Sequence, residues 1–216
     1  MRAIAGIVLA VGLVCGPGFA ADRPGNEVPM YGGLPKTPAQ IAADEKYLAD
    51  IDKLGFTRVQ GSDKSVVLGW QYFFKHDLAT AIKRFNQAWL LDPDNGDSFH
   101  GFALTVYERD HDAAVADDLF KQGLAKPRQQ PGIYLDYGRF LLIVKRPGDA
   151  VPQLQKAVSF ANMGPDAEAL LAQALALSGD IPGACAAAKK IQDGAQATLR
   201  DSVRRLLRTK ECQAAP

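Results

Sequence analysis

The stretch "WQYFFKHDLATAIKRFNQAWLLDPDN", residues 70–95, is the most informative part of the sequence for the fold. Aromatic and aliphatic residues recur at helical spacing on both sides of a polar hinge, Lys75-His76-Asp77, and Pro93 follows the second run. Proline has no amide hydrogen to donate and ends a helix. The stretch therefore predicts two helices joined by a short turn.

The second helix carries a pattern of small and large residues that recurs along the chain. Ala81, Phe85 and Ala88 form the first copy, and the same spacing returns after 35 residues and then twice after 34. The later copies are Ala116, Phe120 and Gly123; Ala150, Leu154 and Ala157; and Ala184, Ala188 and Ile191. In the first helices, Leu68-Gly69 with Tyr72 corresponds to Phe102-Ala103, Tyr137-Gly138 and Leu171-Ala172. The 35-residue step predicts one extra residue in the turn at 108–112.

This series of Leu-Gly, Tyr, Ala, Phe, Ala and Pro resembles the tetratricopeptide repeat (TPR), which has a 34-residue period. Small residues lie where two helices cross closely, and large residues fill the groove beside them. The resemblance implies an all-α fold, a right-handed α-solenoid of four helical hairpins with capping helices at both ends. The four repeats are expected at about 62–95, 96–130, 131–164 and 165–195.

The segments before the repeats have three different characters. Residues 1–20 combine Arg2, an apolar run and small residues, which predicts a signal peptide cleaved after Ala20. Residues 21–36 are rich in proline and glycine, which predicts a flexible leader. Residues 37–61 open with Thr37, Pro38 and Gln40, the signature of a capping box, and predict an N-terminal capping helix that ends at Gly55 and covers the first repeat.

Residues 196–216 predict a C-terminal capping helix. Its apolar stripe consists of Leu199, Val203, Leu206 and Leu207, and most of its arginines lie off that stripe. A polar outer face suits the closing helix of a solenoid. A basic docking surface is the alternative interpretation.

The signal peptide predicts an exported protein, and the TPR resemblance favours the periplasm of a Gram-negative bacterium. Cys15 offers a lipoprotein alternative, but the preceding Gly12-Leu13-Val14 lacks the small residue that usually stands before a lipidated cysteine. No later segment has the roughly 20 apolar residues of a spanning helix, so we expect no membrane-spanning segment.

Charge and motifs argue against several functions. The chain has 25 basic and 24 acidic residues, and removal of Arg2 with the signal leaves them equal, which disfavours a nucleic-acid partner. The three histidines and three cysteines show no metal-ligand spacing, and there is no phosphate loop, dinucleotide fingerprint or nucleophile elbow. We therefore expect no catalytic residues, no metal and no cofactor.

The TPR resemblance implies a protein or peptide partner held on the concave face, which the first helices line. The candidate peptide-binding residues are Val66, Trp70, Phe73, His100, Leu104, Tyr107, Leu135, Arg139, Leu142 and Gln173. They predict an aromatic and aliphatic groove with one fixed cation, Arg139, which could pair with a carboxylate of the peptide. For Trp70, Phe73 and Leu142, burial in the core is the competing interpretation.

Three functional hypotheses follow. The first is a non-catalytic periplasmic interaction scaffold, with assembly of the cell envelope as one role it could serve. The second is an immunity-type inhibitor of an exported toxin, and the third is an enzyme or cofactor-binding helical domain.

Cys185 and Cys212 remain after processing, an even number in an oxidising compartment, and this makes a disulfide possible. Two straight antiparallel helices turning near Gly194 would leave the two cysteines about 13 Å apart along the axis. A bridge therefore requires the chain beyond Lys210 to fold back. Two unpaired thiols are the alternative.

Overall fold

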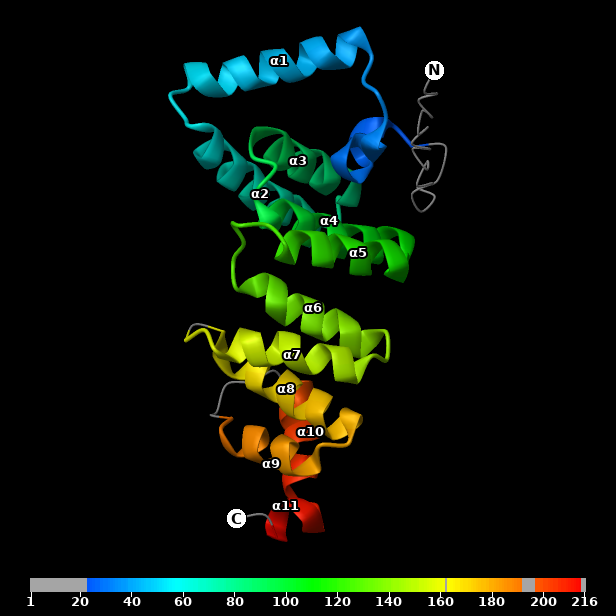
Figure 1. Cartoon of the computed structure of the whole chain (residues 1–216), viewed down its shortest axis with the longest axis vertical. Coiled ribbons are helices and arrows are strands. Elements are labelled where there is room, and N and C mark those ends of the chain that lie inside the picture. Colours follow the sequence, from blue (N-terminus) through cyan, green and yellow to red (C-terminus); the bar gives the residue numbers. More distant parts are fainter. Residues whose placement is uncertain (1–22, 162, 192–196, 215–216) are drawn as a thin grey trace, which may run out of the picture.

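The computed structural model describes residues 23–161, 163–191 and 197–214, and within these ranges the chain is built from α-helices and two short 3-10 helices, with no strand. Helices stack as antiparallel hairpins along one axis, from α1 at one end to α11 at the other (Figure 1). The four hairpins are α2 Arg58–Phe74 with α3 Leu78–Leu91, α4 Gly96–Asp110 with α5 Ala113–Leu124, α6 Gly132–Ile143 with α7 Pro147–Val158, and α8 Gly164–Ser178 with α9 Ile181–Lys189. The predicted all-α solenoid of four hairpins is confirmed.

The predicted small and large positions form the contact between the two helices of a hairpin. A Cβ atom on Gly69 of α2 would lie 2.4 Å from the ring of Phe85 on α3, and one on Gly138 would lie 2.5 Å from Leu154. Both large side chains are fully buried. Leu68 departs from the expected packing role, because its side chain is 40% exposed.

Each hairpin turn contains one residue with a left-handed backbone. These residues are His76, His111, Lys145 and Gly179, with φ angles of 58°, 54°, 61° and 95°. Each is followed by the N-cap of the second helix, and the caps are Asp77, Asp112, Arg146 and Asp180. The extra residue of the second repeat therefore lengthens α4 and leaves the turn unchanged, since His111 keeps its spacing to Ala116.

The leader is folded against the first two repeats, so the prediction of a flexible leader is wrong for its described part. The 3-10 helices η1 Gly25–Glu27 and η2 Pro29–Gly33 pack on α3, and Val28 between them is buried. The side-chain amide of Asn86 donates to the carbonyls of Asn26 and Val28 at 3.0 and 2.9 Å. These bonds tie the main chain of the leader to a buried side chain of the first repeat.

The N-terminal helix α1 spans Pro38–Lys53 and begins with the predicted capping box. It ends before Gly55, and a second capping box, Thr57 with Gln60, starts α2 at Arg58, so the first repeat begins earlier than the predicted residue 62. None of the α1 residues is buried. Helix α1 thus contacts only loosely the first repeat that it was predicted to cover. The Tyr47 hydroxyl lies 3.1 Å from Ser65 Oγ of α2.

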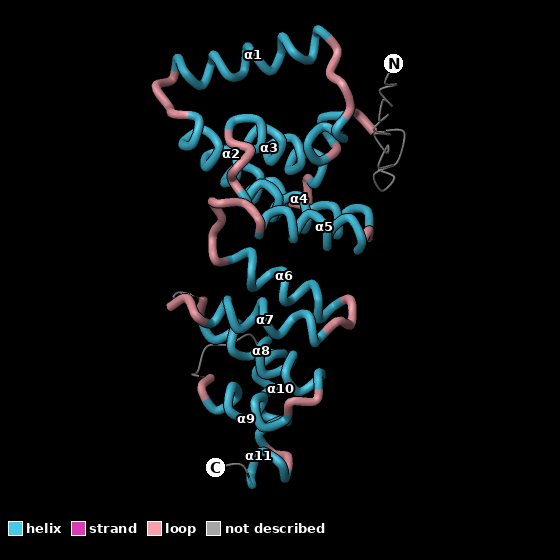
Figure 2. Tube along the Cα trace, viewed as in Figure 1, coloured by secondary structure: helices cyan, strands magenta, loops and turns pink. Residues whose placement is uncertain are grey.

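The C-terminal segment forms two helices, α10 Ala197–Leu207 and α11 Lys210–Ala214, where one was predicted (Figure 2). Helix α10 packs on α8 and α9 and buries Val203. The break between the two helices turns α11 back toward α9. Cys212 is there joined to Cys185, with their Cα atoms 5.3 Å apart.

Candidate interaction groove

Two adjoining cavities form a groove along the first helices α2, α4 and α6. One of about 300 Å³ lies between the C-terminal halves of these helices, and one of about 490 Å³ lies nearer their N-terminal ends. Trp70 lines both cavities and separates them. We call the first the apolar cavity and the second the acidic cavity.

Seven of the ten candidate residues line this groove. They are Val66, Trp70, Phe73, His100, Leu104, Tyr107 and Arg139. Leu135 and Leu142 line neither cavity and instead pack, half-buried, against the hydrophobic core. Gln173 on α8 is half-buried and also lines neither cavity. The structure thus concentrates the candidates on the first three repeats.

An aromatic cluster surrounds Trp70 at the centre of the groove. Its ring centroid lies 5.5 Å from that of Phe73 and 6.1 Å from that of Phe74. On the core side it contacts Phe85 and His100 at centroid distances of 5.3 and 4.8 Å. Trp70 thus packs on the core and also lines both cavities, and its part in binding stays a prediction.

Asp136 contacts two of the candidate residues, His100 and Arg139. His100 is buried and its Nε2 lies 3.0 Å from Asp136 Oδ2, while Arg139 Nη1 donates to Asp136 Oδ1 at 3.1 Å. Arg139 therefore already has one carboxylate partner within the chain, while its side chain stays 40% exposed. Asp136 was absent from the candidates, although its spacing of three residues to Arg139 on a helix is a readable signal.

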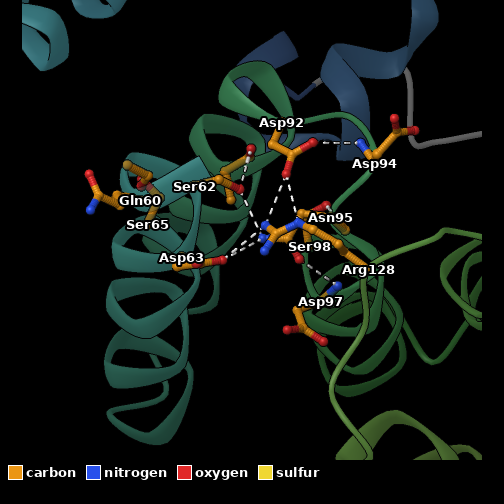
Figure 3. Close-up of polar contacts among 12 residues, drawn as sticks. Gln60, Ser62, Asp63, Ser65, Asp92, Asp94, Asn95, Asp97, Ser98 and Arg128 are labelled. Carbon is orange, nitrogen blue, oxygen red and sulfur yellow. Dashed lines mark hydrogen bonds and ion pairs between the residues drawn. The ribbon is translucent and has the colours of Figure 1, made fainter. Parts of the chain in front are cut away.

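A polar network holds the rim of the acidic cavity (Figure 3). Arg128, in the loop after α5, donates to Asp63 of α2 and to Asp92 in the loop after α3, both at 3.0 Å. The buried amide of Asn95 donates to Ser62 Oγ at 2.9 Å. These contacts join the first two repeats and fix the position of Asp63, which lines the cavity.

A row of exposed apolar side chains was missed by the sequence analysis. Phe74, Ile143 and Leu177 are 76%, 56% and 60% exposed, and each ends, or nearly ends, the first helix of its hairpin. Each stands two residues before the left-handed residue of its turn, so the three are equivalent positions of repeats one, three and four. Alignment of the repeats would have shown the recurrence, but not the exposure.

A larger cavity of about 630 Å³ lies between the leader, α1 and α3. Its lysines are engaged within the chain, since Lys36 pairs with Asp44 and Lys83 pairs with Glu27. Burial raises the pKa of the Tyr31 hydroxyl in its wall well above the usual value. These internal pairs favour a structural role for this region.

The described residues contain no group of three or more His, Cys, Asp or Glu side chains arranged to hold a metal ion. They also contain no helix that is long and apolar enough to cross a membrane. Residues 1–20, the predicted signal peptide, lie outside the described part of the chain.

Comparisons with known proteins place the fold. No protein-family model matches the sequence, and no curated protein compared with it matches either. PilF of Pseudomonas aeruginosa has a similar solved structure, with a TM-score of 0.60 and 21% identity over 69% of each chain. YrrB, a TPR protein with an unusual peptide-binding site, has a TM-score of 0.59 and 18% identity over 79% of this chain and 87% of its own.

A thermophilic TPR protein of Thermus thermophilus is also similar, with a TM-score of 0.53 and 15% identity over 78% of this chain and 94% of its own. These similar structures are TPR proteins. The chain therefore has the TPR fold, as the sequence motif implied.

Proposed function

We propose that this protein is a non-catalytic interaction module of the periplasm that holds a segment of a partner protein in the groove of α2, α4 and α6. The observation that carries the proposal is the row of exposed apolar side chains at equivalent repeat positions, Phe74, Ile143 and Leu177. Isolated exposed apolar residues are common on protein surfaces. Two of the three, Phe74 and Ile143, border the apolar cavity, and exposed apolar side chains gathered beside a cavity are typical of an interaction site.

The groove has the chemistry of a peptide site. Phe74 and Ile143 line the apolar cavity together with Phe73, Leu104 and Tyr107. These side chains offer anchoring positions for apolar residues spaced along an extended or helical segment. YrrB, which has a similar fold, has a peptide-binding site, and this favours a peptide over a small molecule as the class of ligand.

Two observations support export to the periplasm. The first is the signal-like sequence of residues 1–20. The second is the disulfide between Cys185 and Cys212, because such bonds persist in oxidising compartments. Intact-mass analysis of the exported fraction is expected to give a chain that begins at Ala21 or Asp22. A chain that retains residue 1 would refute the assignment to the periplasm.

Site-specific photocrosslinking in the native host tests the groove. A photoreactive phenylalanine analogue replaces Phe74 or Ile143 in the groove, and replaces Leu54 as the control. Leu54 is a matched control because it is 68% exposed and lines neither groove cavity. We expect the same discrete adduct from both groove positions and none from Leu54.

A charge substitution gives the second arm of the test. Phe74→Glu is expected to abolish the adduct formed at position 143 without lowering the melting temperature, because Phe74 is exposed in the free protein. Identical adducts from Leu54 and from the groove positions, or none from the groove, would refute the proposal. Identification of an exported toxin in the adduct would select the immunity-type alternative.

A further inference from the structure

The acidic cavity differs in charge from the rest of the groove. Asp63 and Asp97 contribute carboxylates to its wall, Trp70 and His100 contribute rings, and no lysine or arginine from the described part of the chain lines it. The nearest guanidinium groups are already engaged, because Arg128 bridges Asp63 and Asp92, and Arg139 pairs with Asp136. The cavity therefore presents a negative potential beside an aromatic wall.

Asp97 is the carboxylate without a counter-ion. Its Oδ1 accepts a hydrogen bond of 2.7 Å from the main-chain N–H of Gln130. No lysine or arginine of the described residues lies within ion-pair distance of Asp97. Burial raises the pKa of this carboxyl above its usual value, and this effect exceeds the lowering by the Gln130 N–H and by His100 and Arg128, which lie beyond ion-pair distance. The ionised side chain is thus held at a cost in stability.

Asparagine would keep the structural role of this position. Its side-chain oxygen could accept the same bond from Gln130, and it would carry no charge to desolvate. The hydrogen bond from Gln130 therefore does not explain why position 97 carries an aspartate and not an asparagine. Charged groups held in unfavourable surroundings are typical of functional sites.

We propose that the acidic cavity receives the side chain of a lysine or arginine from the partner segment, with Asp97 as its ion-pair partner and Trp70 as its aromatic wall. This inference rests on the proposed function and specifies the chemistry of its ligand. A cation is attracted by a carboxylate and by the face of an indole ring, and the two attractions act together at this site. Because Trp70 also lines the apolar cavity, the basic residue of the segment lies next to an apolar one.

Selection from a random peptide library displayed on phage tests the inference without knowledge of the partner. The full mature chain is immobilised, and bound peptides are sequenced and resynthesised. We expect enrichment of peptides with Lys or Arg next to an aromatic or aliphatic residue. Affinities for wild type, Asp97→Asn, Asp94→Asn and Trp70→Ala are then measured by titration calorimetry.

Asp97→Asn is expected to weaken binding of these peptides about tenfold or more, since it removes a charge-assisted interaction. The same variant is expected to melt at a higher temperature, because the desolvated charge is lost. Asp94→Asn, an exposed neighbour that lines neither cavity, is expected to bind like wild type. If Asp97→Asn melts at a higher temperature but binds the peptides more weakly, Asp97 binds the ligand and does not serve to stabilise the fold.

The outcomes distinguish the two proposals. Selected peptides that depend on Trp70 but lack basic residues, or that bind Asp97→Asn as tightly as wild type, overturn the cation proposal and leave the groove in place. If every selected peptide binds Trp70→Ala as tightly as wild type, the groove proposal and the cation proposal are both overturned. A lower melting temperature for Asp97→Asn with unchanged peptide affinity shows that Asp97 serves only the start of α4.

Discussion

The side-chain amide of Asn86 on α3 donates a hydrogen bond of 2.9 Å to the carbonyl of Val28, a residue 58 positions earlier in the chain. The same nitrogen donates to the carbonyl of Asn26, and Arg109 of α4 donates to the carbonyl of Glu27. Three main-chain carbonyls of the leader are thus held by side chains of the first two repeats.

Substitution of Asn86 is expected to release the leader. Asn86→Ala removes the side-chain donor from two carbonyls. The Val28 carbonyl keeps its bond from the Tyr31 N–H, whereas the part-buried carbonyl of Asn26 is left unpaired, at a cost of no more than about 1–3 kcal/mol. Limited proteolysis should then cut the chain between residues 23 and 36 faster than in wild type. Asn95→Ala is the matched control, because Asn95 is as buried and has no bond to the leader. Equal cleavage of the leader in wild type and Asn86→Ala would contradict this role.

Asp117 makes stability depend on pH. Burial would raise the pKa of this carboxyl, but hydrogen bonds from Lys121 and Tyr137 and the charge of Arg146 hold it below its usual value. A lowered pKa adds stability above the unfolded value of about 3.9, and this stability is lost as the pH falls through the folded pKa.

Urea unfolding at a series of pH values from about 6 to 2.5 checks this expectation. Wild type should lose more stability over that range than Asp117→Asn, which has no charge to neutralise. Asp118→Asn serves as the neighbouring control, since the Asp118 carboxylate accepts only from Gln122. Parallel pH curves for wild type and Asp117→Asn would show that Asp117 contributes nothing to the pH dependence.

Lys145→Gly is expected to stabilise the protein. Lys145 has a φ angle of 61°, a left-handed conformation that costs roughly 1–2 kcal/mol for a residue with a Cβ and little for glycine. The free energy gained by relieving this strain exceeds the entropic cost of ordering a glycine on folding. The midpoint of urea unfolding should therefore rise. Lys156→Gly, in the last turn of α7, should lower the free energy of unfolding instead, by no more than the roughly 0.5–1 kcal/mol that glycine costs inside a helix. A fall for both variants would show that the turn at Lys145 is not strained.

The bond between Cys185 and Cys212 should stabilise the C-terminal end. It closes a separation of 27 residues, for which about 2–4 kcal/mol is typical. Cys212→Ser should therefore unfold at a lower urea concentration than the oxidised wild type, and reduction of wild type should have the same effect. Thiol labelling of the unfolded, unreduced protein should find no free thiol. Two labelled thiols per chain would exclude the bond.

Local patterns were enough to predict the helices and their pairing. The contact of Gly69 with Phe85 joins neighbouring helices, and its spacing of 16 residues returns between Gly138 and Leu154, so it can be read along the chain. The capping box of Thr37 and Gln40 is more local still, since it depends on four consecutive residues. Even the exposed row that includes Phe74 and Ile143 follows the repeat.

Contacts between distant residues were not predictable in this way. Asn86 and Val28 share no pattern in the sequence. The proline and glycine of the leader therefore predicted flexibility, and only the structure shows that a buried amide binds its carbonyls. His100 likewise pairs with Asp136 of the next repeat, 36 positions later in the chain, and no local pattern indicates this contact. Helices and their caps follow from interactions within a few residues. Charge balance in the groove and the docking of the leader depend on which side chains the stacked repeats bring within hydrogen-bonding distance.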